Sequence, residues 1–190
     1  MTGTWFTSDT HFDHQLVAGL RGFDSPGEHD AAVVANWNAV VRPDDTVWHL
    51  GDVGMGRLSR FAEWIGMLHG EIHLITGNHD ACAPIHRGAH KHQRQWLSTG
   101  FASIQAYARL RINGKSVLLS HFPYRGSGDH TAEERYTQYR FVDDGNWLLH
   151  GHTHSTERQQ GRQVHVGLDA WGLKPVSVDT IAELIVSCGE

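Results

Sequence analysis

Strand-like and helix-like segments alternate three times in the first half of this chain. Short apolar runs within residues 4–9, 45–52 and 71–80 each lead into polar residues, and apolar residues recur at helical spacing over 28–41 and 57–68. Neighbouring parallel strands need a crossover segment between them, and that segment is usually a helix. The alternation therefore predicts an α/β fold in which a largely parallel sheet is covered by helices.

The second half of the chain predicts a mixed sheet. Two strand-like runs within residues 107–121 flank Asn113-Gly114, a dipeptide that favours a type I′ hairpin turn. Further short strands are expected within residues 146–154, 162–169 and 175–179. The sequence shows neither an internal repeat nor a linker, so we expect a single domain over residues 1–190.

Three other segments have less regular patterns. Residues 81–100 are expected to form a loop followed by a helix. Residues 180–187 fit either a strand or a short helix. Residues 125–140 form a long polar stretch, and a loop of that length inside a compact domain is uncommon unless it is functional or disordered.

The composition narrows the class of protein and its surroundings. The formal net charge of −5 does not favour binding to a long polyanion such as duplex DNA. The first residues lack the basic and apolar regions of a secretory signal, and no apolar run approaches the roughly 20 residues that a membrane-spanning helix needs. With only Cys82 and Cys188 in the chain, free thiols in a reducing compartment are expected rather than a disulfide. We therefore expect a cytoplasmic protein that does not enter a membrane.

Side chains of the kinds that bind metal ions follow five of the predicted strands. They are Asp9 and His11 after the first strand, Asp52 after the second, Asn78, His79 and Asp80 after the third, His121 after the hairpin, and His150, His152 and His154 after the next. In open α/β sheets, ligands bind beyond the carboxyl ends of the strands, where the loops converge. Any one of these motifs alone would be an ordinary turn or polar loop, but the whole set in this order predicts a metal site. Its mixed nitrogen and oxygen donors suit Mn, Fe, Zn or Co. No cysteine lies in these motifs, which argues against a closed structural zinc site.

The series DTH, GD, GNHD, H and GHTH, which runs from Asp9 to His154, resembles the calcineurin-like metallophosphoesterase superfamily. Within it, the chain is similar to the compact bacterial and phage phosphoesterases, which share the SDTHF opening, an NWN helix and a late VGLDAW segment. The resemblance implies two mixed β-sheets packed face to face and flanked by helices, a four-layer αββα sandwich. It also implies a binuclear metal centre at the strand ends.

The resemblance further implies how the ligands would be divided between two metal ions. One ion would be held by Asp9, His11, Asp52 and His154, and the other by Asp52, Asn78, His121 and His152. Asp52 would then be the bridging carboxylate. Two divalent or trivalent ions are expected, with Mn²⁺ first and Fe, Zn, Co or Ni as alternatives.

The same resemblance makes His79 the non-ligating imidazole that binds the phosphoryl oxygen and helps the leaving group to depart. Asp80 is expected either to orient His79 as a catalytic partner or simply to cap a helix. Strand alternation points His150 the same way as His152, and we expect it to pack or to support a ligand rather than to bind metal.

These features together predict a metal-dependent phosphoester hydrolase, in which a metal-bridging hydroxide attacks small phosphomonoesters or phosphodiesters, including nucleotide-like ones. His14, Arg125 and Arg135 are candidates for binding the substrate. The two arginines lie in the polar stretch 125–140, which would otherwise be a solvated charged loop. The acidic net charge disfavours long duplexes, and a nuclease for short or single-stranded nucleic acid ends is the alternative function. A non-catalytic scaffold is disfavoured because every ligand motif is present.

Overall fold

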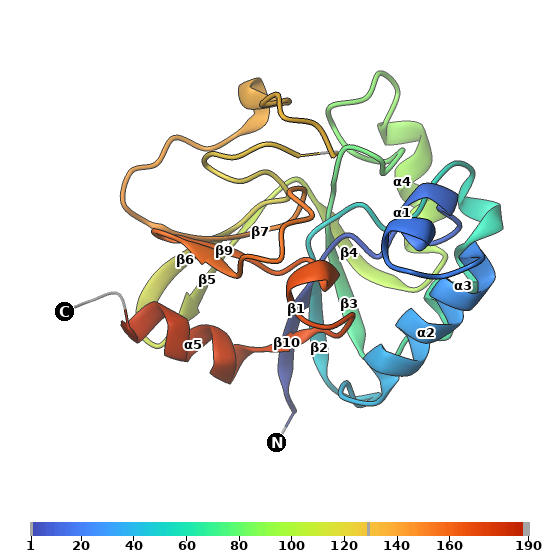
Figure 1. Ribbon diagram of the computed structural model, residues 1–190, viewed down its shortest axis with the longest axis horizontal. Helices are drawn as coiled ribbons and strands as arrows, with labels where there is room; N and C mark the ends of the chain where they lie inside the picture. The colour runs from blue at the N-terminus through green and yellow to red at the C-terminus, as the bar shows by residue number, and fades with distance from the viewer. Residues whose placement is uncertain (1, 129, 188–190) are drawn as a thin grey trace.

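The computed structural model describes residues 2–128 and 130–187 of the chain. The thiol predicted at Cys188 lies outside these residues, whereas Cys82 is buried and makes no disulfide. The described residues form two five-stranded β-sheets that pack face to face and are flanked by helices (Figure 1). This arrangement confirms the predicted α/β class of fold. None of the described helices is long and apolar enough to cross a membrane.

The first sheet is mainly parallel. Its strands, in spatial order, are β10 (Val176–Ser177), β1 (Thr4–Thr7), β2 (Thr46–His49), β3 (Glu71–Ile75) and β4 (Phe101–Gln105). Strands β1 to β4 pair in parallel, and β10 pairs with β1 in the antiparallel direction. The carboxyl ends of four strands therefore meet at one edge of this sheet.

The second sheet begins with the predicted hairpin. In spatial order it contains β5 (Ala108–Ile112), β6 (Lys115–Leu119), β7 (Trp147–His150), β9 (Gln163–His165) and β8 (Gln159–Gln160). The turn between β5 and β6 has φ values of 46° at Asn113 and 74° at Gly114, and a type I′ turn requires positive φ at both positions. Strands β6, β7 and β9 run parallel, so their carboxyl ends also share one edge.

The helices confirm some predicted segments and correct others. They are α1 (Gln15–Leu20), α2 (Pro26–Asn38), α3 (Ala62–Gly66), α4 (His90–Leu97) and α5 (Val178–Ser187), with 3-10 turns η1 (Leu58–Arg60), η2 (Thr137–Tyr139) and η3 (Leu168–Ala170). The predicted helix 57–68 is split into η1 and a shorter α3, and the open choice at 180–187 is resolved as helix. Helix α1 and strand β4 were not predicted, because each is too short to show a clear period.

Helix α2 begins two residues earlier than its apolar pattern suggests. The side chain of Ser25 accepts a hydrogen bond from the backbone N–H of Glu28 at 3.2 Å, and Pro26 occupies the first helical position. A serine cap followed by proline is a strong helix start. The serine side chain accepts a hydrogen bond from an N–H group of the first turn, and proline has no N–H group that would need a partner there. The buried face of α2, which includes Val33 and Trp37, then packs on the first sheet.

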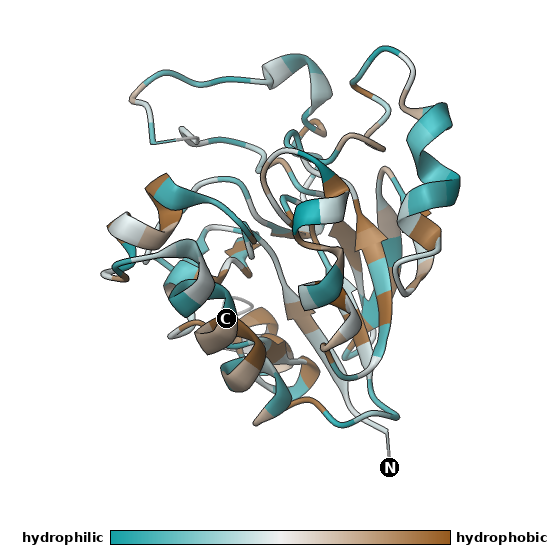
Figure 2. Ribbon diagram, turned by 90° about the vertical axis from the view of Figure 1, so that its right-hand side faces the viewer, coloured by the Kyte–Doolittle hydropathy of each residue, from teal (hydrophilic) through white to brown (hydrophobic). Residues whose placement is uncertain are grey.

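Two apolar layers hold the fold together. One lies between the first sheet and helices α2, α3 and α4, and it includes Trp37, Val47 and Trp96. The other lies between the two sheets and includes Phe6 and Leu149. Figure 2 shows hydrophobic residues concentrated on the inner strands, while the long loops at the top of that view are mainly hydrophilic. The polar loops at the strand ends therefore extend from strands that are packed in these two apolar layers.

Candidate metal centre

The loops that carry the predicted ligands are joined to one another by backbone hydrogen bonds. The N–H of Asp9 donates to the carbonyl of Gly51 at 2.9 Å, and the N–H of His11 donates to the carbonyl of Asp52 at 3.1 Å. The N–H of His152, from the second sheet, donates to the carboxylate of Asp9 at 3.1 Å. The two sheets thus bring their ligand loops together, as the order of motifs in the sequence predicted.

Asp9, His11 and His154 form the first cluster that could hold a metal ion. One ligand atom from each of these three lies within 4.8 Å of the others. Nε2 of His11 lies 3.1 Å from Nε2 of His154 and 3.9 Å from Oδ1 of Asp9. Nitrogen and oxygen donors gathered at this spacing can share one cation, provided that the imidazoles are neutral.

Asp52, His121 and His152 form the second cluster, which is completely buried. Their ligand atoms also lie within 4.8 Å of one another. Nε2 of His121 lies 3.3 Å from Oδ2 of Asp52 and 3.0 Å from Oδ1 of Asn78. The predicted amide ligand therefore stands beside the predicted imidazole ligand, at the same cluster.

Asp52 lies between the two clusters. Its Oδ1 accepts a hydrogen bond from the backbone N–H of His79 at 2.8 Å. Its Oδ2 is 3.3 Å from Nε2 of His121 and 3.8 Å from Nε2 of His11, yet it accepts no hydrogen bond of good geometry from any described residue. Burying a charged oxygen without a hydrogen bond costs free energy of folding, and a bound cation would offset that cost by pairing with the negative charge. The residues present therefore fit a metal pair with Asp52 between its members.

The electrostatics of His121 support the same conclusion. Its Nδ1 lies 2.7 Å from the carbonyl of Leu50 and donates to it, which turns Nε2 toward Asp52. Burial works to lower the pKa of His121, but the carboxylates of Asp52 and Asp9 outweigh burial and raise the pKa to about 10. In the protein without metal, a proton on His121 thus offsets negative charge that cations would otherwise neutralise.

Arg21 and Asp169 form hydrogen bonds to residues of the first cluster, and neither of them was identified from the sequence. Nδ1 of His154 lies 3.1 Å from Oδ2 of Asp169, which fixes the ring so that Nε2 faces the cluster. Arg21 donates two hydrogen bonds to Asp169, at 2.9 and 2.8 Å, and a third to the backbone carbonyl of Asp9. Burial opposes ionisation of Asp169, but Arg21 and His154 hold its pKa well below the usual value. Asp169 lies in the VGLDAW segment, so only its neighbourhood was visible in the sequence.

Asp80 joins two of the ligand loops. Its carboxylate accepts hydrogen bonds from the backbone N–H groups of Asp52 and Val53, each at 3.0 Å, and from that of Gly77 at 2.7 Å. Burial, together with the charge of Asp52, raises the pKa of Asp80 to about 6. These bonds hold the loops after β2 and β3 at a fixed spacing, a role that neither sequence-based alternative for Asp80 anticipated. The predicted orienting action on His79 stays a prediction.

The backbone is strained at most of the candidate ligands. Residues in the left-handed region include Asp9, His11, Asp52, His152 and His154, with φ values of 58°, 47°, 56°, 70° and 51°. This conformation is unfavourable for residues other than glycine, at about 1–3 kcal/mol each, and it persists only where the surroundings enforce it. Such outliers cluster at functional sites, so their concentration here supports a functional rather than a merely structural cluster.

A cavity of about 210 Å³ opens beside the first cluster, and His11 and His154 form part of its lining. Three predicted site residues outside the ligand set line it, namely His14, His79 and Arg135. Nδ1 of His14 lies 3.2 Å from Nδ1 of His11, and Nε2 of His79 lies 4.0 Å from Oδ2 of Asp52. The structure therefore brings His14 and His79 to the centre, as the sequence predicted.

The described residues of the polar stretch 125–140 reach this cavity. The backbone of Gly126 donates to Glu134 at 2.7 Å and accepts from Arg140 at 2.7 Å, so the loop is tied to itself at its base. It delivers Arg135 to the cavity, together with His130, whose ring centroid is 4.4 Å from that of His154. His130 was missed because nothing in a long polar stretch marks which residue will line the cavity.

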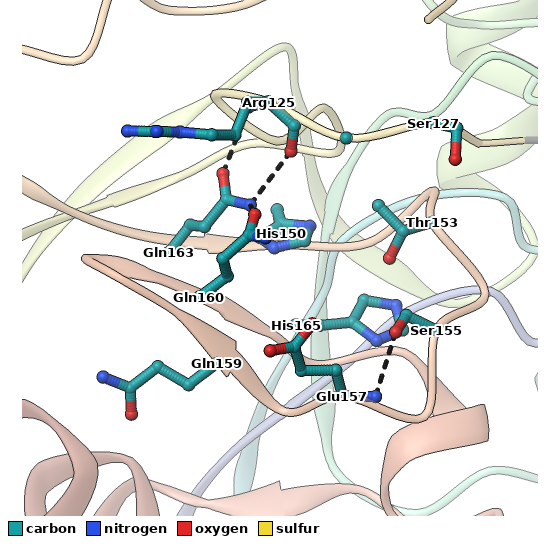
Figure 3. A pocket seen from close by; sticks show the side chains of 11 residues that line it. Arg125, Ser127, His150, Thr153, Ser155, Glu157, Gln159, Gln160, Gln163 and His165 are labelled. Atoms are coloured by element: carbon teal, nitrogen blue, oxygen red, sulfur yellow. Dashed lines mark hydrogen bonds between the residues drawn. The ribbon is translucent and has the colours of Figure 1, made fainter. Parts of the chain in front are cut away.

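Arg125 lies outside this cavity, and its predicted contact with the substrate stays a prediction. Its guanidinium is exposed and pairs with Asp143 at 3.1 Å. Its backbone is hydrogen-bonded to the side chain of Gln163, and it borders a second cavity together with His150 and His165 (Figure 3). The structure therefore does not bring Arg125 together with His14, His79 and Arg135. His150 is buried and donates to the carbonyl of Gly151 at 2.8 Å, which confirms its packing role.

Two sheets bring carboxylates and imidazoles together where their strand ends meet, an arrangement that is able to bind metal ions. The chain belongs to the calcineurin-like phosphoesterase superfamily, whose sequence model matches residues 4–175. The family implies divalent metal ions, and the two His/Asp clusters are able to bind them.

The chain is similar over nearly its whole length to several known proteins. It is 44% identical to the Gene 66 protein of Mycobacterium phage L5, a match that covers 97% of this chain and 95% of that protein. It is 41% identical to the Gene 66 protein of Mycobacterium phage D29, over 97% and 96% of the two chains. The crystal structure of AQ665 from Aquifex aeolicus, a protein of unknown function, matches with a TM-score of 0.72 and 25% identity, over 97% of this chain and 100% of that one.

Proposed function

We propose that this chain hydrolyses small phosphomonoesters or phosphodiesters, including nucleotide-like ones, with two metal ions held between its sheets. One ion is held by Asp9, His11, Asp52 and His154, and the other by Asp52, Asn78, His121 and His152. Mn²⁺ is the first candidate, with Fe, Zn, Co and Ni as alternatives, because the donors mix imidazole nitrogen with carboxylate and amide oxygen.

The observation that carries this proposal is the position of Asp52. Its buried Oδ2 faces imidazole nitrogens of both clusters and lacks a hydrogen bond from the described residues. A carboxylate can bridge two cations whereas an imidazole cannot, and here the carboxylate stands between the two candidate sites. A structural role would leave this oxygen with a hydrogen-bond donor, as Asp80 has for both of its oxygens.

The chemistry follows from the side chains that surround the bound phosphate. A pair of bound cations would lower the pKa of a water molecule and neutralise phosphate oxygens during an in-line displacement. His79, which lines the cavity and is tied to Asp52 through its backbone, donates a hydrogen bond to a phosphoryl oxygen and a proton to the leaving oxygen. His14 and Arg135, which line the same cavity, bind the remaining phosphate oxygens. No covalent phospho-enzyme is required.

The net charge and the cysteine of the described residues bear on the size of the substrate and on the cellular compartment. A net charge of −5 supports small substrates over long nucleic acids. Cys82 is buried and unpaired by a disulfide, which supports a reducing compartment such as the cytoplasm.

A grid of metals against substrates tests the proposal. Chelator-treated protein is supplied with Mn²⁺, Fe²⁺, Zn²⁺, Co²⁺, Ni²⁺ or Mg²⁺ and assayed on aryl phosphomonoesters, aryl phosphodiesters, cyclic nucleotides and short single-stranded oligonucleotides. We expect Mn²⁺ to restore hydrolysis of an aryl ester by at least about 100-fold over the chelated protein, because metal ions supply several kcal/mol of transition-state stabilisation. Equal rates with and without metal would contradict the proposal. Activity confined to oligonucleotides, with a steep loss on adding salt, would replace it with the nuclease alternative.

A further inference from the structure

The cavity beside the candidate metal centre has an apolar wall as well as polar groups. Leu16 and Val17 of α1 and Met55 of the loop after β2 line the same cavity as His11 and His79. A pocket for a small inorganic ion would need no apolar surface. Pockets for organic ligands, in contrast, combine an apolar lining with a few polar groups that fix the orientation.

The apolar wall is attached to the same loops as the candidate ligands. Met55 donates its backbone N–H to the carbonyl of Phe12 at 2.8 Å, and Phe12 forms an isolated β-bridge with Gly54. This bridge joins the segment that carries His11 to the segment that carries Asp52. The wall is therefore fixed relative to the centre and does not depend on a separate mobile element.

Two leucines of α1 allow the wall to be distinguished from ordinary exposed apolar surface. Leu16 is 59% exposed and lines the cavity, whereas Leu20, one turn further along the helix, is 60% exposed and is not part of the lining. Single exposed leucines are common and carry no meaning alone. Leu16 is different because it lines the same cavity as Val17, Met55 and the polar side chains of the candidate site.

We propose that the wall formed by Leu16, Val17 and Met55 binds an apolar, ring-bearing ester group of the substrate while the phosphate lies at the metal centre. This inference rests on the proposed function and names the class of substrate. The cavity of about 210 Å³ is large enough for such a ring, since cavities of about 150 Å³ accept benzene. Sugar phosphates and other polar esters would leave the wall uncovered and would gain nothing from it.

Binding of two phosphonates to the manganese-loaded protein tests this inference without requiring turnover. Phenylphosphonate and methylphosphonate carry the same anionic group and differ only in the apolar part. We expect calorimetry to give a Kd about tenfold lower for phenylphosphonate, which is the usual size of such discrimination in an apolar pocket. Leu16→Ser and Met55→Gln should each reduce this ratio at least about threefold, and Leu20→Ser, the matched control, should leave it unchanged. Melting temperature and bound manganese are measured for every variant.

The outcomes separate the inference from the function on which it rests. Equal affinities of the unaltered protein for both phosphonates, or equal ratios in Leu16→Ser, Met55→Gln and the unaltered protein, would overturn the apolar wall while leaving phosphate binding intact. A ratio that falls as much in Leu20→Ser as in Leu16→Ser would also overturn it. If neither phosphonate binds the manganese-loaded protein, the proposed function fails and the inference fails with it.

Discussion

Replacement of Asp52 by asparagine is expected to lower kcat for an aryl phosphoester by about 1,000-fold or more, which corresponds to about 4 kcal/mol of lost transition-state stabilisation. Asparagine has the same shape but carries no charge, so it cannot compensate two cations from the position between His11 and His121. The metal-free variant should be less stable than the unaltered protein near neutral pH, because the substitution removes the carboxylate that pairs with protonated His121 in the buried site. Activity with saturating Mn²⁺ and chemical unfolding in chelator provide the two measurements.

The control for this variant lies at the other end of the same strand. Asp45 is also buried, and it precedes β2 whereas Asp52 follows it. Its carboxylate accepts hydrogen bonds from Gly3 and from the indole of Trp5, so Asp45→Asn should cost stability rather than turnover. If Asp52→Asn keeps more than about a tenth of the activity, or if Asp45→Asn loses as much, a bridging role for Asp52 is wrong.

Gly77→Ala should remove both metal binding and activity, although it adds only one methyl group. A Cβ at this position would press against Oδ1 of Asp52 and lie 2.6 Å from the backbone nitrogen of Asp52 and 2.8 Å from Nδ1 of His121. Real Cβ atoms do not approach so closely, so the loops after β2 and β3 must separate. We expect at least a 100-fold loss of kcat/KM and about 2–3 kcal/mol of lost stability from overpacking.

Gly27→Ala is the matched control for this glycine. It lies in α2, and a Cβ there would meet nothing within 4 Å. Because alanine favours helix, this variant should keep full activity and be slightly more stable, by up to about 1 kcal/mol. Titration with Mn²⁺ followed by assay compares the two variants. Normal metal affinity in Gly77→Ala would show that the loops are not held at the spacing described.

Local rules made part of this structure predictable from the sequence. The alternating apolar patterns gave the order of the first three strands and the helices between them, and Asn113-Gly114 specified the hairpin turn. The candidate ligands were visible because each follows a strand, and carboxyl ends of parallel strands share an edge. His14, which was predicted from its spacing to His11, and His79, which was predicted from the family resemblance, both line the cavity beside the first cluster.

Contacts between distant segments were not predictable in the same way. Arg21 and Asp169 are separated by 148 residues, and their pairing depends on how the second sheet packs on the first. The loop 125–140 shows the same limit, because Arg125 and Arg135 are both exposed, yet Arg135 lines the cavity at the first cluster whereas Arg125 pairs with Asp143 and borders another cavity. The left-handed backbone at His11, His152 and His154 was also not predictable from the sequence, because histidine is enriched in this conformation but adopts it in only a minority of cases.

Anomalous diffraction from a crystal soaked in Mn²⁺ tests the central claim most directly. We predict two manganese peaks about 3.5–4 Å apart, one at Asp9, His11 and His154 and the other at Asn78, His121 and His152. The carboxylate of Asp52 should contact both. A single peak, peaks elsewhere in the molecule, or no peak at saturating Mn²⁺ would contradict the account.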